Sequence, residues 1–448
     1  MGLSKYTPDW IHDKGSRSLY PVLPIVILSS SYQGFDGMIM NGLQLLPGWQ
    51  ERPVLDRFGR RKAIAFSASR TLLGAALEGS ALQGSAHQIP KFVISRLLIG
   101  FGLAFAVVGS PLLLAELAFS KHRGTVLSYF PTAWYIGSII AAWTTFGRIG
   151  TRHINNSWSW RVPSLLQAGL ALIQIFLIVF FPESPRWLIS HGLGAEAKAF
   201  LTKYHANGDE NSPVLELEYS ETKDANLQGL EYKRREAGRT LSRLLLTGGD
   251  LSLPPFVFSG NGLVQYYLHS VLLSTGITST ATQTTINGCL AIYNFVIAII
   301  ASLFVEKVGR RKLFLISTAG MFVAFILWTT FAAPHAAAPL GHRVLVSIFL
   351  SNGAYDIGWT PLWGYPAELL PFEVRAHGVA YMTGVMHISG FFSTFVNPVG
   401  LENIGWRYYI VYIVYTGLEF LAVWYFFVET RGFTLEEIWT MCETPGLS

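Results

Sequence analysis

Charged residues are scarce in this sequence, and cysteines are almost absent. Only 14% of its 448 residues are Asp, Glu, Lys or Arg, whereas a soluble protein carries roughly a quarter. Two cysteines, Cys289 and Cys442, are too few for a disulfide framework. The sequence also lacks metal-ligand spacings, a nucleophile elbow and a phosphate-binding loop, which argues against an enzyme, a bound metal and a cofactor.

Long apolar runs take the place of the missing charge, since 51% of the residues are hydrophobic. Each run is about as long as a helix that crosses roughly 30 Å of hydrocarbon. Backbone groups in lipid must be satisfied internally, so such runs form helices. The sequence therefore predicts an all-α, polytopic protein that spans a lipid bilayer with about 11 transmembrane helices. The runs cover about 20–41, 63–85, 90–117, 125–147, 162–182, 253–273, 284–305, 313–333, 342–370, 377–399 and 408–428.

One polar stretch divides the apolar runs into a group of five and a group of six. The predicted domains are an N-terminal bundle (1–182), a cytoplasmic linker with short helices (183–243), a C-terminal six-helix bundle (244–428) and a cytoplasmic tail (429–448). Basic residues gather in short clusters that all fall on one side of the predicted bilayer, which is the positive-inside pattern of cytoplasmic loops. The net charge of +5 therefore gives no indication of nucleic-acid binding.

The two groups of runs are related by an internal repeat. The segment Asp56-Arg57-Phe58-Gly59-Arg60-Arg61-Lys62 recurs as Glu306-Lys307-Val308-Gly309-Arg310-Arg311-Lys312. Glu116 with Arg123 recurs as Glu368 with Arg375, and the segment 182–186 has a weaker echo at 428–432. Duplicated halves at a nearly constant offset are typical of secondary transporters, which hold substrate between the halves.

The repeat also predicts that one helix is missing from the first half. Gly34-Phe35-Asp36-Gly37 corresponds to Gly260-Asn261-Gly262 at a shorter offset, so about 24 residues are lacking between Trp49 and Asp56. The six residues present there span at most roughly 20 Å and cannot cross a bilayer. Two topologies remain open: an N-terminus outside the cell, or a chain distorted near 42–62. We hypothesise an error in the predicted gene structure or a splice form.

These motifs together resemble the major facilitator superfamily. The Asp56–Lys62 segment and its repeat resemble its cytoplasmic signature. Five further motifs resemble those of the sugar porter branch. They are Arg96 with Gly100 and Gly102, Glu116 with Arg123-Gly124, Pro182-Glu183-Ser184-Pro185-Arg186-Trp187-Leu188, Pro366-Ala367-Glu368 with Arg375, and Glu429-Thr430-Arg431-Gly432. The segment 355–361 and Asn397-Pro398 are most similar to fungal lactose, cellodextrin and hexose permeases. The resemblance implies two six-helix bundles, here without the second helix.

The resemblance implies a cytoplasmic gate of ion pairs at the helix ends, where Arg57, Arg60 and Arg61 face Glu116 and Arg123. A second set of residues repeats this arrangement: Glu306, Arg310, Arg311, Glu368 and Arg375. Such pairs are expected to lock the halves together in the outward-open state and to break when the protein opens inward. The alternative is that they only anchor helix ends and set topology. The gate residues are Asp56, Arg57, Arg60, Arg61, Glu116, Arg123, Glu183, Arg186, Glu306, Arg310, Arg311, Glu368, Arg375 and Glu429.

Two charged residues lie inside apolar runs, Asp36 in the first and Arg96 in the third. In the family topology their depths match, and such charges are costly in a membrane unless they are paired. Proton-coupled sugar porters carry an Asp at the position of Asp36. We therefore expect Asp36 to load a proton and Arg96 to lower its pKa. A static structural pair is the alternative.

Sugar recognition requires planar amides for hydroxyl pairs and aromatic faces for the ring. By resemblance the binding residues are Asn261, Tyr266, Tyr267, Asn294 and Trp363. The alternative for each aromatic residue is packing. Two family amides are absent, because Pro131 and Val257 stand at their positions.

The leading hypothesis is transport of a sugar, a hexose or a disaccharide such as lactose or cellobiose, by alternating access with proton symport. Passive facilitation is the alternative within this class. The alternatives outside this class are an inactive truncated gene product and a non-transporting sugar sensor. The expected partners are a sugar, a proton and the lipid bilayer, and no nucleic acid. The protein is expected to be a monomer in the plasma membrane.

Overall fold

The computed structural model is helical throughout the residues that it describes. These residues are 30, 59–79, 88–118, 123–150, 158–213, 215–220, 222–223, 261–274, 276–333, 341–362, 365, 372–427 and 429–431, and no strand occurs among them. The long helices of the first half are α4 (Arg60–Gly79), α5 (Gln88–Leu117), α6 (Arg123–Gly150) and α7 (Trp158–Ile178). Two short helices follow, α8 (Pro185–Ser190) and α9 (Gly194–Tyr204).

In the second half, the described residues form six long helices. They are α12 (Asn261–Ser274), α13 (Thr280–Val308), α14 (Arg310–Ala332), α15 (Gly341–Leu362), α17 (Phe372–Ile404) and α18 (Tyr408–Phe426), the last preceded by the 3-10 turn Gly405–Arg407. Their bounds follow the apolar runs closely, because the hydrophobic stretch decides where each helix is stable. Local signals refine the ends: Ser279 caps α13 by accepting a hydrogen bond from the Thr282 N–H at 3.4 Å.

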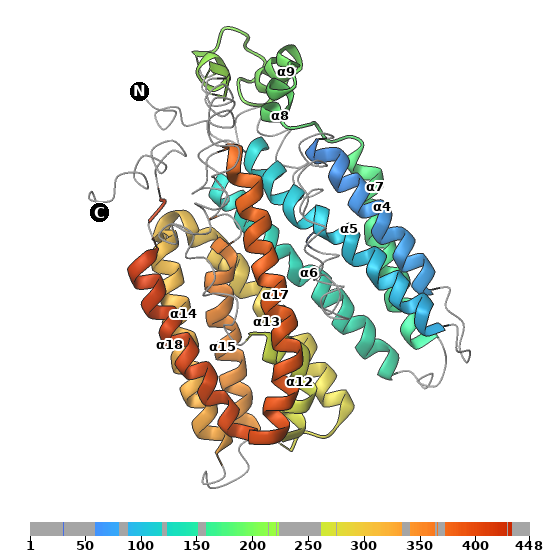
Figure 1. Cartoon of the computed structure of the whole chain (residues 1–448), viewed down its shortest axis with the longest axis vertical. Coiled ribbons are helices and arrows are strands. Elements are labelled where there is room, and N and C mark those ends of the chain that lie inside the picture. Colours follow the sequence, from blue (N-terminus) through green and yellow to red (C-terminus); the bar gives the residue numbers. More distant parts are fainter. Residues whose placement is uncertain are drawn as a thin grey trace, which may run out of the picture.

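The two halves lie side by side in Figure 1, with α4–α7 forming one half and α12–α18 the other. Helices α8 and α9 lie at one end of the molecule, beyond the ends of the long helices. Within the first half, α4 and α5 pack closely because glycines face the partner helix. A Cβ added at Gly74 would lie 2.8 Å from the Ser95 carbonyl oxygen, and one at Gly102 would lie 2.8 Å from that of Ser67.

The halves meet mainly where α6 packs against α13 and α15, with a smaller contact between α5 and α17. Polar side chains join the halves at this seam. The hydroxyls of Thr132 on α6 and Ser302 on α13 lie 3.0 Å apart. Ser302 also donates to the Ser128 carbonyl at 3.3 Å. The seam between the bundles is therefore polar as well as apolar, as the interface of two bundles that hold a polar solute would be.

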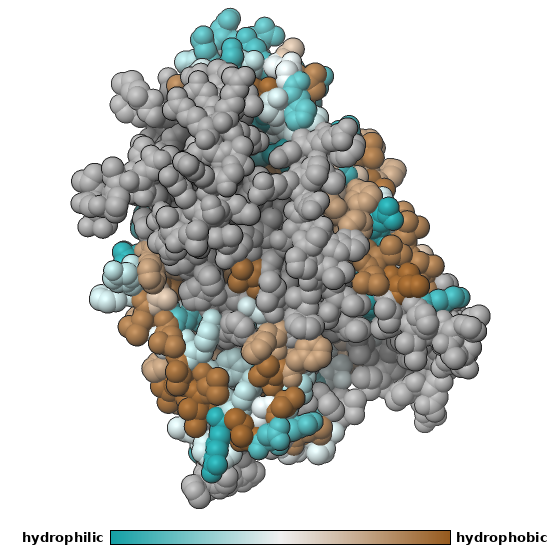
Figure 2. Space-filling view, viewed as in Figure 1, coloured by the Kyte–Doolittle hydropathy of each residue, from teal (hydrophilic) through white to brown (hydrophobic). Residues whose placement is uncertain are grey.

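The outward surfaces suit a bilayer. Large apolar side chains are more than half exposed on both halves, including Phe176, Phe180, Leu418 and Tyr425. Figure 2 shows brown, apolar side chains on the flanks of both halves and teal, hydrophilic ones at the end that carries α8 and α9. Among the described residues, four stretches are long and apolar enough to span a membrane: 94–117, 281–308, 310–332 and 395–426.

Residues 42–58, the region where a helix is expected to be missing, lie outside the described residues. The predicted count of eleven spans, the two open topologies and the domain boundaries stay predictions.

Candidate functional site

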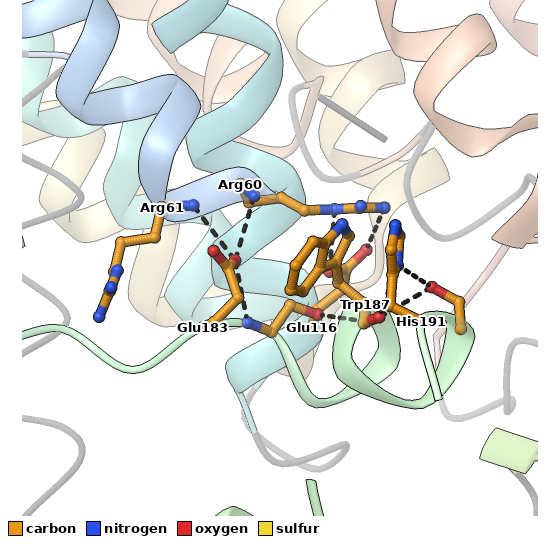
Figure 3. A network of polar contacts seen from close by, with 8 residues as sticks. Arg60, Arg61, Glu116, Glu183, Trp187 and His191 are labelled. Carbon is orange, nitrogen blue, oxygen red and sulfur yellow. Dashed lines mark hydrogen bonds and ion pairs between the residues drawn. The ribbon is translucent and has the colours of Figure 1, made fainter. Parts of the chain in front are cut away.

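The N-terminus of α4 is capped by a carboxylate from far along the chain (Figure 3). Glu183 Oε1 accepts hydrogen bonds from the backbone N–H groups of Arg60 at 3.1 Å and Arg61 at 3.2 Å. The first N–H groups of a helix have no partner within the helix and carry a partial positive charge. Glu183 therefore satisfies and neutralises the start of α4 from the segment that follows α7.

Glycine is required beside this carboxylate. Gly59 precedes α4 with φ +92°, a conformation that favours glycine, and a Cβ there would lie 2.5 Å from Glu183 Oε2. The glycine in the repeated motif thus makes space for the capping group.

The side chain of Arg60 ties α4 to α5. Its Nη2 donates to Glu116 Oε1 at 3.4 Å, and its Nε lies 3.3 Å from Glu116 Oε2. The two side chains are 6% and 1% exposed. Arg61 turns elsewhere and donates from Nη1 to the Phe181 carbonyl at 2.9 Å. The two arginines therefore fasten α4 to both α5 and the end of α7.

Helix α8 continues the same network. Ser184 is its N-cap and accepts from the Trp187 N–H at 3.3 Å, while Pro185 occupies the first turn, where it loses no hydrogen bond. The rings of Trp187 and His191 stack with centroids 4.2 Å apart. Figure 3 shows these residues around the Arg60–Glu116 pair.

The second half repeats this arrangement. Glu429 Oε1 accepts from the Arg310 N–H at 2.8 Å, which caps α14, and Gly309 has φ +95° with its open side against the Glu429 carboxylate. The Arg310 guanidinium donates twice to Glu306, at 3.0 and 2.8 Å. Arg311 donates from Nη2 to the Trp424 carbonyl at 2.8 Å. The helix caps and the arginine–carbonyl bonds therefore repeat, whereas the Arg60 guanidinium bonds Glu116 on α5 and the Arg310 guanidinium bonds Glu306 on α13.

These contacts lie within each half, and the lock between the halves stays a prediction. Arg60–Glu116 and Glu183 with α4 lie within the first half, and Arg310–Glu306 and Glu429 with α14 lie within the second. Each set fastens the helix ends of its own bundle. Of the other gate residues, Arg186 is half-buried in α8. Arg123 and Arg375 lie in α6 and α17 without described side chains, and Asp56, Arg57 and Glu368 lie outside the described residues.

The environment of Glu183 shifts its proton affinity. Burial raises the pKa of the Glu183 carboxyl above its ordinary value of 4.5. Hydrogen bonds from the Ser184 and Arg61 N–H groups and the charges of Arg60 and Arg61 act in the opposite direction, but burial outweighs them.

The predicted proton-coupling pair is described only in part. Arg96 lies on α5 and is 4% exposed, as expected for a guanidinium inside the bundle. Asp36 lies outside the described residues. Their pairing stays a prediction.

The predicted sugar-binding residues are spread over the second half. Asn261 begins α12, and its Oδ1 is buried without a hydrogen-bond partner among the described residues. Tyr267 sits at a break in the same helix, with φ −121° and ψ 18°. Broken helices are typical of substrate sites in transporters. Tyr266 lies in α12 without a described side chain, and Trp363 lies outside the described residues.

The side-chain amide of Asn294 on α13, a predicted sugar ligand, is hydrogen-bonded to a carboxylate. With its Nδ2 turned toward α15, its amide donates to Asp356 Oδ2 at 3.3 Å and to the Leu290 carbonyl at 3.2 Å. Tyr135 on α6 donates its O–H to the other oxygen of Asp356. Asp356 and Tyr135 were not among the predicted site residues, although a carboxylate within the apolar run 342–370 was a sufficient signal for the first.

A second polar cluster joins α17 to α18. Asn397 Oδ1 accepts hydrogen bonds from the hydroxyls of Tyr408 at 2.8 Å and Tyr412 at 2.6 Å. The ring of Tyr408 also lies against Gly400, where a Cβ would come within 2.4 Å of it. Asn397 stands out in the sequence only through the family resemblance, because nothing in a single sequence pairs it with tyrosines on the next helix.

Comparison with known proteins decides the class to which these two linked bundles belong. The family described as "Sugar (and other) transporter" matches residues 52–442. The chain belongs to this family of major facilitator transporters. Its fold class, predicted from the motifs, is therefore confirmed, and transport is its class of activity.

Individual sugar transporters show how far the similarity extends. The MFS glucose transporter mfs1 of Aspergillus flavus is 29% identical over 424 residues, which cover 86% of this chain and 77% of that protein. The D-xylose-proton symporter of Escherichia coli K12 is 29% identical over 372 residues, or 79% of this chain and 72% of that one. Among solved structures, the proton:xylose symporter XylE bound to 6-bromo-6-deoxy-D-glucose superimposes with a TM-score of 0.81 at 23% identity, covering 95% of this chain and 99% of that chain.

Proposed function

We propose that this sugar transporter family member carries a hexose or a disaccharide such as lactose or cellobiose by alternating access, with symport of a proton. The observation that carries the proposal is the polar seam between the halves. Thr132 and Ser302 bond across it, and Asn294 lies on the same helix as Ser302. Hydroxyl-rich solutes require such hydrogen-bonding groups in an otherwise apolar cavity wall.

The broken helix α12 supports the same assignment. Asn261 begins this helix, and its buried Oδ1 has no hydrogen-bond partner in the part of the chain that the structure describes; Tyr267 marks the break. A buried acceptor without a partner is costly, so a sugar hydroxyl that donates to Asn261 would remove that cost. In this proposal Tyr266 and Trp363 supply aromatic faces, and Asn294 supplies an amide when Asp356 releases it.

Proton coupling is proposed for Asp36 with Arg96, and it is supported by the burial of Arg96 and by the named activity of the Escherichia coli relative. The capped helix ends are proposed as the cytoplasmic gate in a modified form. Each half keeps its own ends rigid through Glu183 or Glu429, so that the bundles move as rigid bodies around the seam. We further propose a monomer in the plasma membrane.

The test is uptake of labelled glucose, lactose and cellobiose in cells without their own sugar carriers, measured together with surface localisation. Saturable uptake of one sugar by surface-localised protein is expected. Surface-localised protein that takes up none of the three would contradict the assignment. If the chain is retained inside the cell, a variant with a helix of about 24 residues restored after Trp49 separates a trafficking defect from a wrong function.

The symport part has its own test, because Asp36→Asn removes the titrating group without changing the size of the side chain. We expect this variant to exchange sugar but to lose accumulation against a gradient. Accumulation equal to that of the unchanged chain would rule out Asp36 as the coupling residue.

A further inference from the structure

Helix α15 carries a fully buried carboxylate in its apolar interior. Asp356 is 0% exposed, and it lies about 13 residues from Arg343, the cation of its own helix, or roughly 20 Å along the axis. A charged side chain within a membrane-spanning helix is costly and generally marks an ion or proton pathway. The roles proposed above mention this group only as the carboxylate that holds the Asn294 amide.

The partners of Asp356 are neutral and come from two other helices. Tyr135 on α6, in the opposite half, donates its hydroxyl to Oδ1, and Asn294 on α13 donates from Nδ2 to Oδ2 at 3.3 Å. The carboxylate is thus held by a phenol and an amide. Neither donor neutralises its charge, in contrast to the arginine that holds Glu116 at the cytoplasmic end.

The helices packed against α15 are α14, α13, α6 and α12. Their charged residues lie near their ends, which are roughly 15–20 Å from the level of Asp356 at 1.5 Å per residue. At that level α14 presents Gly320 against Ala354, and the titratable groups facing Asp356 are the tyrosines 135 and 293. The charged residues of these helices are Arg310, Arg311, Lys312, Glu306, Lys307, Arg123 and Arg148, and α12 contains no Asp, Glu, Lys or Arg.

We propose that Asp356 is a proton-binding site whose occupancy depends on the contact that Tyr135 makes across the seam. The proposal rests on the proposed symport and extends it to a residue of the second half. When α6 lies against α15, the phenol stabilises the ionised carboxylate. When the halves move apart, the carboxylate loses a donor, and binding a proton offsets that loss.

Asn294 can serve both protonation states. An amide offers two N–H donors on one side and an acceptor oxygen on the other. With Nδ2 toward Asp356 it donates to the carboxylate, and with Oδ1 toward Asp356 it accepts the proton of the carboxylic acid. Loading forms one O–H bond on a carboxylate oxygen with a proton from water on the acidic side, and unloading returns that proton to water on the other side.

The site also connects the proton to the sugar. Asn294 is a proposed sugar ligand, and its amide is occupied by Asp356 in the present state. Sugar that recruits this amide takes a donor from the carboxylate and thereby favours its protonation. Proton and sugar then bind together, which is the requirement for symport.

The experiment uses the full chain in proteoliposomes with labelled glucose, or with lactose or cellobiose if uptake in cells identifies one of those. Counterflow, which needs no gradient, is compared with accumulation driven by an inside-alkaline pH difference. We expect Asp356→Asn to retain counterflow and to lose at least ten-fold in driven accumulation. The matched control is Glu419→Gln, which neutralises another buried carboxyl of the same half and should keep driven accumulation.

Tyr135→Phe provides a second, milder test that keeps the carboxylate. Removing a donor to the ionised form favours the protonated form, so the pH at half-maximal uptake should move upward by at least half a unit. Tyr412→Phe removes a buried hydroxyl that bonds Asn397 instead and should leave this midpoint unchanged. If Asp356→Asn loses counterflow as well, the midpoint of Tyr135→Phe decides the question.

The outcomes separate this inference from the proposed function. Absence of counterflow in the unchanged chain would overturn sugar transport itself. Counterflow with full pH-driven accumulation in Asp356→Asn, or an unmoved midpoint in an active Tyr135→Phe, would overturn only the role of Asp356. Accumulation that follows a sodium gradient, and disappears when choline replaces sodium, would overturn the proton as the ligand.

Discussion

The carboxylate of Glu183 fills the space that a side chain at Gly59 would need. Gly59 has φ +92°, and a Cβ there would lie 2.5 Å from Glu183 Oε2. The same relationship joins Gly309 to Glu429 in the other half. A glycine in a cytoplasmic signature and an acidic residue after the last helix of each half are thus two parts of one helix cap.

Gly59→Ala should destabilise the protein for two reasons, the backbone conformation and the displaced carboxylate. A left-handed conformation of a residue other than glycine costs about 1–3 kcal/mol, and the lost cap adds to it. Gly192→Ala is the matched control, because Gly192 has φ +79° with nothing within 4 Å of an added Cβ. Thermal melting in detergent should show a larger loss for Gly59→Ala and Gly309→Ala than for Gly192→Ala. Equal losses would mean that backbone strain alone is responsible.

Glu183→Gln should change how stability depends on pH. Because burial raises the pKa of Glu183 above 4.5, the folded chain holds this proton more tightly than the unfolded chain. Its contribution to stability is therefore present below the unfolded pKa and is lost as the pH rises through the raised folded value. The melting temperature of the unchanged chain relative to Glu183→Gln should fall from about pH 4 to about pH 7. A difference that stays constant, or rises, would contradict this assignment.

Arg60→Met should cost more stability than Arg310→Met. The Arg60–Glu116 pair is almost fully buried, and leaving one buried charge unpaired costs about 3–5 kcal/mol. Glu306 is 34% exposed, so water can solvate it after its partner is removed. Denaturant unfolding of the single variants and of Arg60→Met/Glu116→Leu measures this. The double variant should recover much of the loss, and failure to recover would show that Glu116 has a further essential contact.

Glu419→Leu should raise the melting temperature. Glu419 lies on α18 at 1% exposure, and neither of its carboxylate oxygens has a hydrogen-bond partner among the described residues. Replacing a buried unsatisfied polar group by an apolar one of similar size is generally neutral or stabilising. Glu419→Gln keeps a polar group there and should gain less. A marked loss for Glu419→Leu would reveal a ligand or partner of this carboxyl.

The sequence predicted the helices better than their contacts. The apolar run 284–305 lies within α13, and the run 313–333 lies within α14 except for its last residue, because hydrophobic length decides where a helix can span a bilayer. The repeat correctly paired Gly59 with Gly309 as equivalent positions. It did not show that Glu183 and Glu429 cap α4 and α14, since a contact between residues about 120 positions apart leaves no periodic signal.

The interior polar residues show the same limit. Asp356 was recognisable as a carboxylate in an apolar run, but its donors Tyr135 and Asn294 come from helices that only tertiary packing brings to α15. Arg60 was predicted to face Glu116 and does pair with it, and Arg310 pairs with Glu306 within the repeated set of residues. The lock between the halves stays a prediction. Residue type and the repeat placed Arg60 opposite Glu116, but they did not show that Arg61 and Arg311 donate to backbone carbonyls.

The caps of α4 and α14 also set an order for biosynthesis. The residue that caps Arg60, Glu183, is synthesised 123 residues later, and the residue that caps Arg310, Glu429, is synthesised 119 residues later. At about 5–20 residues per second, a ribosome needs roughly 6–25 s to supply the missing carboxylate. Until then the first N–H groups of each helix lack this acceptor, so each bundle gains its cap only after nearly all of its own repeat has been synthesised.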